Sequence, residues 1–238
     1  MTYLEGFVLA VPAANKQAFR DHAAAAAPLF RELGATRILE AWGDDVPDGK
    51  INDFKTAVKA NSDEVVVFSW LEYPDRATRD AANQRMQTDP RMAAMGDAPF
   101  DGMRMIFAGF EPMVDEGAGG KAGYVDGYLV PVTPANREAY RAKAEKTAAL
   151  FRDHGATRVV EAWGDDVSDG KVTDYRRAVL AKDGEEVVYS FVEWPSKDAR
   201  TAGWEKIMVD ERMKPDGSTM PFDGARMIWG GFSPIIDA

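Results

Sequence analysis

The sequence predicts an α+β protein made of two ferredoxin-like βαββαβ repeats packed sheet against sheet. Three observations lead to this fold class. One phrase occurs twice, as EAWGDDVPDGK from residue 40 and as EAWGDDVSDGK from residue 161. Aligning the chain with itself at an offset of 121 residues makes roughly half of the positions identical. Each copy then shows the same order of strand-like and helix-like segments.

The repeat length divides the chain into a first ferredoxin-like repeat at 1–116, a linker at 117–123 and a second repeat at 124–238. A period this long indicates a duplicated domain, since solenoid repeats are far shorter. The seam DEGAGGKAG is rich in Gly and Ala and has no apolar periodicity, which suits a flexible linker.

The first half of each repeat predicts a strand, a helix and a strand. YLEGFVLAV alternates, with Tyr3, Glu5, Phe7, Leu9 and Val11 on one face. A helix then runs from about residue 15 to 33 and ends at a glycine, with a counterpart at 136–154. TRILEAW is the second strand.

The second half predicts a strand, a helix and a strand. EVVVFSWLEYP is dominated by β-branched and aromatic residues and forms the third strand. A helix begins after Pro74 and extends to about Met86, and the fourth strand, MRMIFAGFEP, follows a turn at 100–102. The segment NDFKTAVKA fits either a helical turn or a strand.

A βαββαβ sheet carries its helices on one face, so its other apolar face has to be covered. Two copies can cover each other about a pseudo-two-fold axis, as the subunits of a homodimer do. We therefore expect a pseudo-dimer within one chain, with a cavity between the two sheets. Further oligomerisation stays open.

Composition excludes several functional classes. A net charge of −10 and no run of Lys or Arg argue against nucleic-acid binding and against binding to anionic membranes. The absence of cysteine excludes disulfides, thiolate nucleophiles and cysteine-ligated metals. The opening MTYLEGFVLAVP resembles a strand more than a secretion signal, so we expect a cytoplasmic protein.

Carboxylates in the middle of strands, flanked by aromatic residues, are unfavourable unless they are paired or solvated. The candidate catalytic residues are Glu40, Glu72 and Arg104, with the counterparts Glu161, Glu193 and Arg226. In the functional interpretation, Glu40 or Glu72 is a general base whose pKa is raised by apolar surroundings, and Arg104 holds an anionic or enolate oxygen. The alternative is an internal ion pair between Arg104 and one of these carboxylates.

An aromatic wall would complete a ligand pocket with few polar groups. The candidate ligand-binding residues are Tyr3, Phe7, Trp42, Trp70, Tyr124, Tyr128, Trp163 and Trp194. The third strand offers either Phe68, Trp70 and Glu72 or the opposite face with Ser69 and Tyr73.

No cofactor or metal is expected. The aspartates of WGDDVPDGK do not match the calcium-loop spacing, so we interpret this segment as a turn and as a candidate rim or interface element. The linker lacks the spacing of a phosphate-binding loop. The two histidines, His22 and His154, do not correspond between repeats, which excludes a histidine-ligated heme in each half.

Taken together, EGFVLAVP, GATRxxEAWGDDVxDGK, VVxSxxE(Y/W)P, DxRM and PFDGxRMI resemble the YbaA-like bacterial family of unknown function, in the dimeric α/β-barrel superfamily. The resemblance covers both repeats and implies the fold and a central barrel cavity. It implies no activity, because that superfamily includes cofactor-free monooxygenases, isomerases, heme enzymes and stress proteins.

We therefore expect a small-molecule pocket between the repeats, serving a cofactor-independent enzyme of proton-transfer or monooxygenase type. The alternative is a non-catalytic ligand-binding or stress-associated protein. At corresponding positions the first repeat has Trp70 and Phe107, where the second has Phe191 and Trp229. Such differences predict that the two halves are unequal. A space between the sheets that is filled by side chains would contradict both of these interpretations and would leave a structural or partner-binding role.

Overall fold

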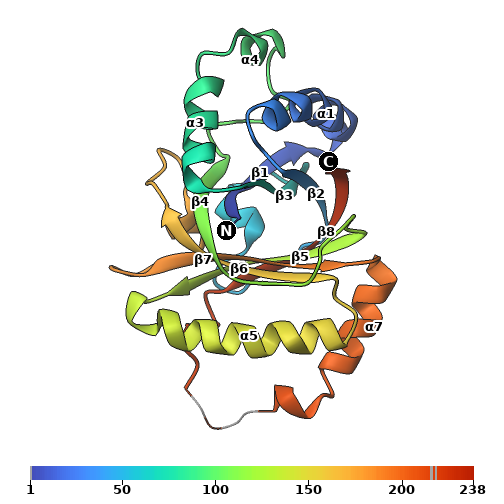
Figure 1. Cartoon of the computed structure of the whole chain (residues 1–238), viewed down its shortest axis with the longest axis vertical. Helices are drawn as coiled ribbons and strands as arrows, with labels where there is room; N and C mark the ends of the chain where they lie inside the picture. The colour runs from blue at the N-terminus through green and yellow to red at the C-terminus, as the bar shows by residue number, and fades with distance from the viewer. Residues whose placement is uncertain (1, 215–216, 218) are drawn as a thin grey trace.

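The computed structural model describes residues 2–214, 217 and 219–238, and within them eight antiparallel strands close into a barrel with helices outside (Figure 1). The first repeat contributes β1 (Tyr3–Pro12), β2 (Arg37–Asp45), β3 (Glu64–Tyr73) and β4 (Ile106–Glu116), with α1 (Lys16–Glu32), α2 (Phe54–Ala57), α3 (Arg76–Met86) and α4 (Pro90–Ala94). The second contributes β5 (Tyr124–Val132), β6 (Arg158–Asp166), β7 (Glu186–Trp194) and β8 (Ile228–Asp237), with α5 (Arg137–Asp153), α6 (Tyr175–Ala178) and α7 (Lys197–Ile207).

Most local signals act as predicted. Gly34 ends α1 with a positive φ of 108°, and the ambiguous segment is the short helix α2, where the Asp53 side chain accepts a hydrogen bond from the Thr56 amide. The fourth strand differs from the prediction. It begins at Ile106, because Arg104 belongs to a turn that is closed by its amide bonding the Asp101 carbonyl, and it continues to Glu116 to pair with β6.

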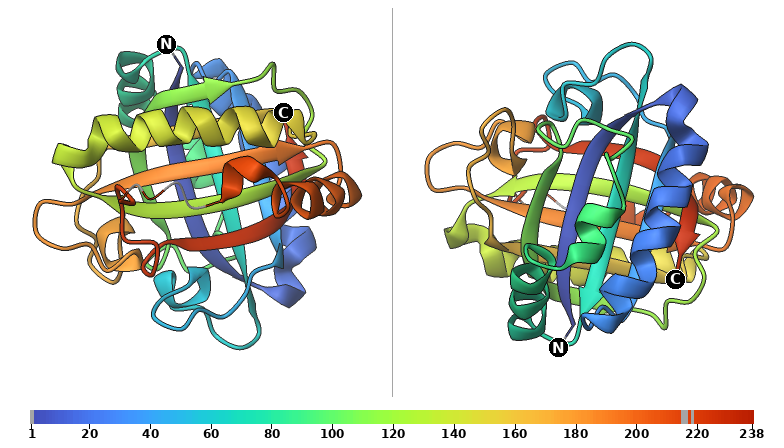
Figure 2. Two further views of the ribbon diagram at one scale, coloured as in Figure 1. Left: turned by 90° about the horizontal axis from the view of Figure 1, so that it is seen from below. Right: turned by 90° about the horizontal axis from the view of Figure 1, so that it is seen from above.

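The strand order around the barrel is β1-β3-β2-β8-β5-β7-β6-β4. Both junctions between the sheets, β2 with β8 and β4 with β6, pair a strand of one repeat with a strand of the other. Helices α1, α3 and α4 cover one sheet, and α5 and α7 cover the other (Figures 1 and 2). No helix in the described ranges is long and apolar enough to cross a membrane.

The interior of the barrel is a packed core. The rings of Phe68 and Tyr189 stack at a centroid distance of 4.5 Å, and those of Trp70 and Phe191 stack at 3.9 Å. None of these four residues is more than 1% exposed. The prediction of a cavity between the two sheets is therefore wrong, because aromatic side chains fill that space.

Two glycines make this packing possible. A Cβ added at Gly6 would lie 2.8 Å from the Tyr189 ring, and one added at Gly127 would lie 2.9 Å from the Phe68 ring. The ring of each repeat thus lies against the bare backbone of the other. At one end of the barrel, Phe54 from α2 and Tyr175 from α6 join the same core.

Candidate functional site

The predicted site residues divide between the two faces of the barrel wall. Trp70, Glu72 and Glu193 lie on the inward face, since Trp70 belongs to the interior core and the two glutamates meet charged residues at one barrel end. Glu40 and Glu161 lie on the outward face. The outward face also carries Tyr3, Phe7, Trp42, Tyr124, Tyr128, Trp163 and Trp194, which contact helices or the hydrophobic clusters beneath them. The prediction that these residues line one chamber is wrong.

The predicted anion-holding arginines are paired elsewhere. Arg104 donates two hydrogen bonds to the Glu64 carboxylate, at 2.6 and 2.7 Å. Its counterpart Arg226 pairs in the same way with Glu185, at 2.6 and 2.8 Å. Arg104 thus forms an ion pair, as the alternative interpretation predicted, but with Glu64 and not with Glu40 or Glu72. Neither Arg104 nor Arg226 pairs with a candidate base.

A cluster of buried charges closes the barrel end near the linker. Arg37 donates hydrogen bonds to both oxygens of Glu193, at 2.6 and 3.0 Å, and to both oxygens of Asp237, at 3.0 and 3.1 Å. Burial opposes the charge of Arg37, but the hydrogen bonds to Asp237 and Glu193 outweigh it and keep the pKa of Arg37 above its ordinary value. Arg37 of the first repeat therefore holds two carboxylates of the second repeat, those of Glu193 and Asp237.

The pseudo-symmetric half of this cluster is built around Arg158. It donates to both oxygens of Glu72, at 2.6 and 3.2 Å, and of Asp115, at 2.8 and 2.9 Å. The Trp70 indole also donates to Glu72, at 3.1 Å. Glu72 and Glu193 thus form ion pairs between the repeats. This geometry suits a structural role, which is to join the two repeats, better than the role of a general base.

The repeated phrase also joins the two repeats. Asp44 accepts a hydrogen bond from Tyr124 at 2.9 Å and forms an ion pair with Lys197 at 2.6 Å. The next residue, Asp45, pairs with Arg200 at 3.1 Å. Asp165 makes the corresponding contacts with a tyrosine and an arginine of the first repeat. The prediction of an interface element is confirmed, and these contacts explain why both copies keep the same aspartates.

Glu40 is a half-buried carboxylate with a hydrogen bond to only one of its two oxygens among the described residues. The Ser69 hydroxyl donates to Oε2 of Glu40, while no hydrogen-bond donor among the described residues reaches Oε1. Burial raises the pKa of Glu40 to about 7, against the opposing effect of the Ser69 hydrogen bond. The residue is nevertheless only half-buried, so solvent still reaches it. A carboxylate in this state can take up a proton near neutral pH.

Glu161 is the counterpart in the second repeat and differs in its partners. The Tyr140 hydroxyl of α5 donates to its Oε2 at 2.8 Å. Burial raises the pKa of Glu161 to about 7, and hydrogen bonds from Tyr140 and Ser190 act in the opposite direction. The two carboxylates therefore share a pKa but not a hydrogen-bonding environment.

Strand register places Glu40 at one end of an aromatic row on the outer face. Glu40 pairs with Ser69, Ser69 with Phe7, and Phe7 with Phe107 on four neighbouring strands. Adjacent strands lie about 4.8 Å apart, so Phe7 is roughly 10 Å from Glu40. The Phe7 and Phe107 rings stack at 6.2 Å, and Phe107 is 55% exposed. The row thus joins the exposed Phe107 to Glu40 through Phe7 and through Ser69, which is 2% exposed.

The raised pKa of Glu40 predicts a pH-dependent gain in stability for Glu40→Gln. Burial lifts its pKa from 4.5 to about 7, so its contribution to stability is fully present below about pH 4.5 and is lost as the pH rises through about 7. Because the residue keeps solvent contact, we expect Glu40→Gln to stabilise the fold by about 1 to 2 kcal/mol at pH 8 and by almost nothing at pH 5.

Urea unfolding at both pH values measures this difference. Glu111→Gln is the matched control, because the Glu111 side chain is 55% exposed and pairs only at the surface with Arg137. A gain for Glu40→Gln that is equal at pH 5 and pH 8 would contradict the burial of an ionisable group.

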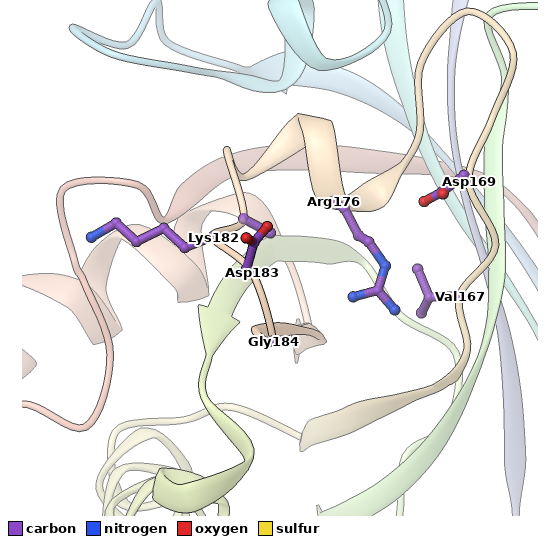
Figure 3. Close-up of a pocket in the computed structure, with 7 residues that line it drawn as sticks. Val167, Asp169, Arg176, Lys182, Asp183 and Gly184 are labelled. Carbon is purple, nitrogen blue, oxygen red and sulfur yellow. The ribbon is translucent and has the colours of Figure 1, made fainter.

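A surface depression lies beside α6, at the end of the barrel opposite the charge cluster of Arg37 and Arg158. It is lined by Val167, Asp169, Arg176, Ala181, Lys182, Asp183 and Gly184 (Figure 3). Arg176, the central cation, already pairs with Glu186 at 3.1 Å. The depression contains none of the predicted site residues, and it is polar and open, so we do not assign the site to it.

The fold and the two outer-face carboxylates define a tandem ferredoxin-like barrel protein that carries a carboxylate of raised pKa in each repeat. The chain belongs to the family described as "Protein of unknown function (DUF1428)", whose model matches residues 2–102 and 123–224. It is similar to the "Uncharacterized protein YbaA" of Escherichia coli K12 and of Shigella flexneri, with 61% identity over 117 residues. These residues are 49% of this chain and the whole of each relative, which confirms the resemblance.

Two solved structures share the fold. A protein of Fusobacterium nucleatum designated "Putative monooxygenase" matches with a TM-score of 0.61 and 11% identity, over 99% of this chain and 93% of its own. A protein of Lactobacillus acidophilus with the same designation matches with a TM-score of 0.59 and 10% identity, over 100% of this chain and 95% of its own. At these identities the likeness shows the fold alone.

Sequence reasoning missed several residues that build the site. Arg37 and Arg158 follow the identical GAT segments of both repeats, and that identity was the available signal. Ser69 lies on one of the two faces of its strand, and the sequence pattern did not decide which of these faces carries the site. Tyr140 lies on a helix, and nothing local indicates that its hydroxyl reaches a strand carboxylate.

Proposed function

We propose that the protein binds a small, largely apolar ligand on the outer face of the first repeat and that Glu40 accepts a weakly acidic proton from it. The observation that carries the proposal is the state of Glu40: Ser69 donates to one oxygen, and no donor in the described part of the chain reaches the other. The aromatic row through Phe7 and Phe107 supplies a surface for the ligand.

The pKa of Glu40 suits this role. A general base works best when its pKa is close to the operating pH, and burial brings Glu40 to about 7. Near neutral pH the carboxylate is therefore partly ionised and strong enough to take a proton from an enolisable C–H. Ser69 fixes the orientation of the carboxylate, and the proton taken up by the free oxygen returns to the ligand or to water.

Hydrogen–deuterium exchange of 2-tetralone, a small aromatic ketone with an acidic CH₂ group, tests the proposal. Proton NMR in D₂O would follow the loss of the CH₂ signal, which needs only proton abstraction and return. We expect exchange above the buffer rate, lowered about 100-fold or more by Glu40→Gln, and a rate that rises with pH through about 7. The surface variant Glu111→Gln serves as the control.

The outcomes separate an enzyme from a binder. A thermal shift caused by 2-tetralone without accelerated exchange would favour the non-catalytic alternative. Equal exchange by the wild-type protein and by Glu40→Gln would refute the role of Glu40.

A further inference from the structure

The two repeats differ at the helix position that faces the outer-face carboxylate. In the second repeat this position is Tyr140, whose hydroxyl donates to Glu161 at 2.8 Å. In the first repeat it is Phe19, 121 residues earlier. The two rings occupy the same place, because Phe19 packs on Phe100 at 5.8 Å and Tyr140 packs on the equivalent phenylalanine at 5.5 Å.

We propose that this position selects the working site: Phe19 leaves Glu40 open to a ligand, whereas Tyr140 closes the second repeat by occupying Glu161. The inference rests on the proposed proton transfer and restricts it to one site in each chain. Tyr140 acts through the Glu161 carboxylate and is a positioning residue, whereas Phe19 carries no donor.

The hydrogen bond explains the closure. Glu161 has two internal donors, Tyr140 and the strand residue Ser190, so a ligand that delivers a proton to it has to compete with one more donor than at Glu40. A hydrogen bond to a charged group contributes enough to disfavour such a ligand about 10- to 100-fold. Among the described residues, Glu40 accepts a side-chain hydrogen bond from Ser69 alone, and Phe19 cannot supply the second donor that Tyr140 gives to Glu161.

Neighbouring substitutions agree with this assignment. Tyr128 replaces Phe7 in the row and places a second hydroxyl on the outer face of the second repeat. The first repeat therefore has a phenylalanine at both positions, Phe7 and Phe19, where the second has the tyrosines Tyr128 and Tyr140.

Exchanging the two aromatic residues tests the proposal with the 2-tetralone assay. We expect Phe19→Tyr to lower the exchange rate about 10- to 100-fold and to lower the pKa of the Glu40 carboxyl measured by carbon NMR. Adding Tyr140→Phe in the same chain should restore exchange, because it opens the second repeat. Adding Glu161→Gln to that double variant should remove the restored activity.

Control variants keep the test decisive. Phe19→Leu removes the ring without adding a donor and should retain exchange within about threefold. If Phe19→Tyr does not fold, Tyr140→Phe can be added to Glu40→Gln, where it should raise exchange above that of Glu40→Gln alone.

The two proposals fail in different ways. If the wild-type protein shows no exchange, or if Glu40→Gln leaves exchange intact, the proposed function is wrong. If Glu40→Gln abolishes exchange while Phe19→Tyr leaves both the rate and the carboxyl pKa unchanged, proton transfer stands and the selecting role of this position is overturned.

Discussion

Replacement of Arg37 by methionine is expected to lower the free energy of unfolding by about 3 to 5 kcal/mol. Methionine retains the aliphatic part of the side chain and removes only the guanidinium group. The change leaves two carboxylates without their main partner, and the side chains of Glu193 and Asp237 are only 0% and 8% exposed. An uncompensated buried charge, more than the loss of an attractive pair, accounts for this cost.

The matched control is Arg91→Met. Arg91 also pairs with two carboxylates, making hydrogen bonds to Glu32 at 2.7 and 3.1 Å and to Asp89 at 2.9 and 2.8 Å. Arg91 and Glu32 are about half exposed, at 48% and 53%, and Asp89 keeps a hydrogen bond from the Arg91 backbone amide, so we expect a smaller loss of about 1 kcal/mol. Urea unfolding followed by tryptophan fluorescence compares the two variants. Equal losses in the free energy of unfolding would mean that the ion pairs of Arg37 do not act as buried interactions that join the two repeats.

Truncation of Trp70 to alanine is expected to cost about 3 to 5 kcal/mol as well. Trp70 is 1% exposed, stacks on Phe191 at 3.9 Å, and donates its indole N–H to Glu72. The variant would leave a cavity between the two sheets and remove one neutral donor from the charge cluster. Trp229→Ala is the matched control, because Trp229 is 41% exposed and should cost about 1 kcal/mol.

Indole provides a second readout for the Trp70 variant. An apolar cavity inside a rigid core can bind an aromatic molecule of matching shape. We expect added indole to raise the melting temperature of Trp70→Ala and to leave that of the wild-type protein unchanged. A loss below about 1 kcal/mol without rescue by indole would contradict the packed interior described above.

The repeat and the order of its elements could be predicted from the sequence because their causes are local. Glycine at position 34 ends a helix wherever that helix lies, and Asp53 and Asp75 cap the residues that follow them. The internal identity at an offset of 121 residues also predicts that the two copies fold alike. Sheet-to-sheet packing followed because each repeat leaves one sheet face without helices.

The candidate site could be predicted only in part. Alternation identified Glu40 and Glu161 as unusual mid-strand carboxylates, but it left open whether Glu40 shares a face with Trp70 and Glu72 or with Ser69 and Tyr73. Register decides this point: Glu40 pairs with Ser69, so it shares a face with Ser69 and not with Trp70. Register depends on pairing between strands that are distant in the sequence, and a shift of one residue reverses the face of every side chain.

Propensity and capping depend on neighbouring residues, and the internal identity can be read along the chain, so these signals suffice to predict a duplicated βαββαβ unit whose halves cover each other. The filled space between the sheets, the ion pairs of Arg37 and Arg158 with the glutamates of the opposite repeats, and the outward orientation of Glu40 emerge only in three dimensions. These features depend on which side chains meet across the barrel, and contacts of that kind are set by the packing of the whole chain.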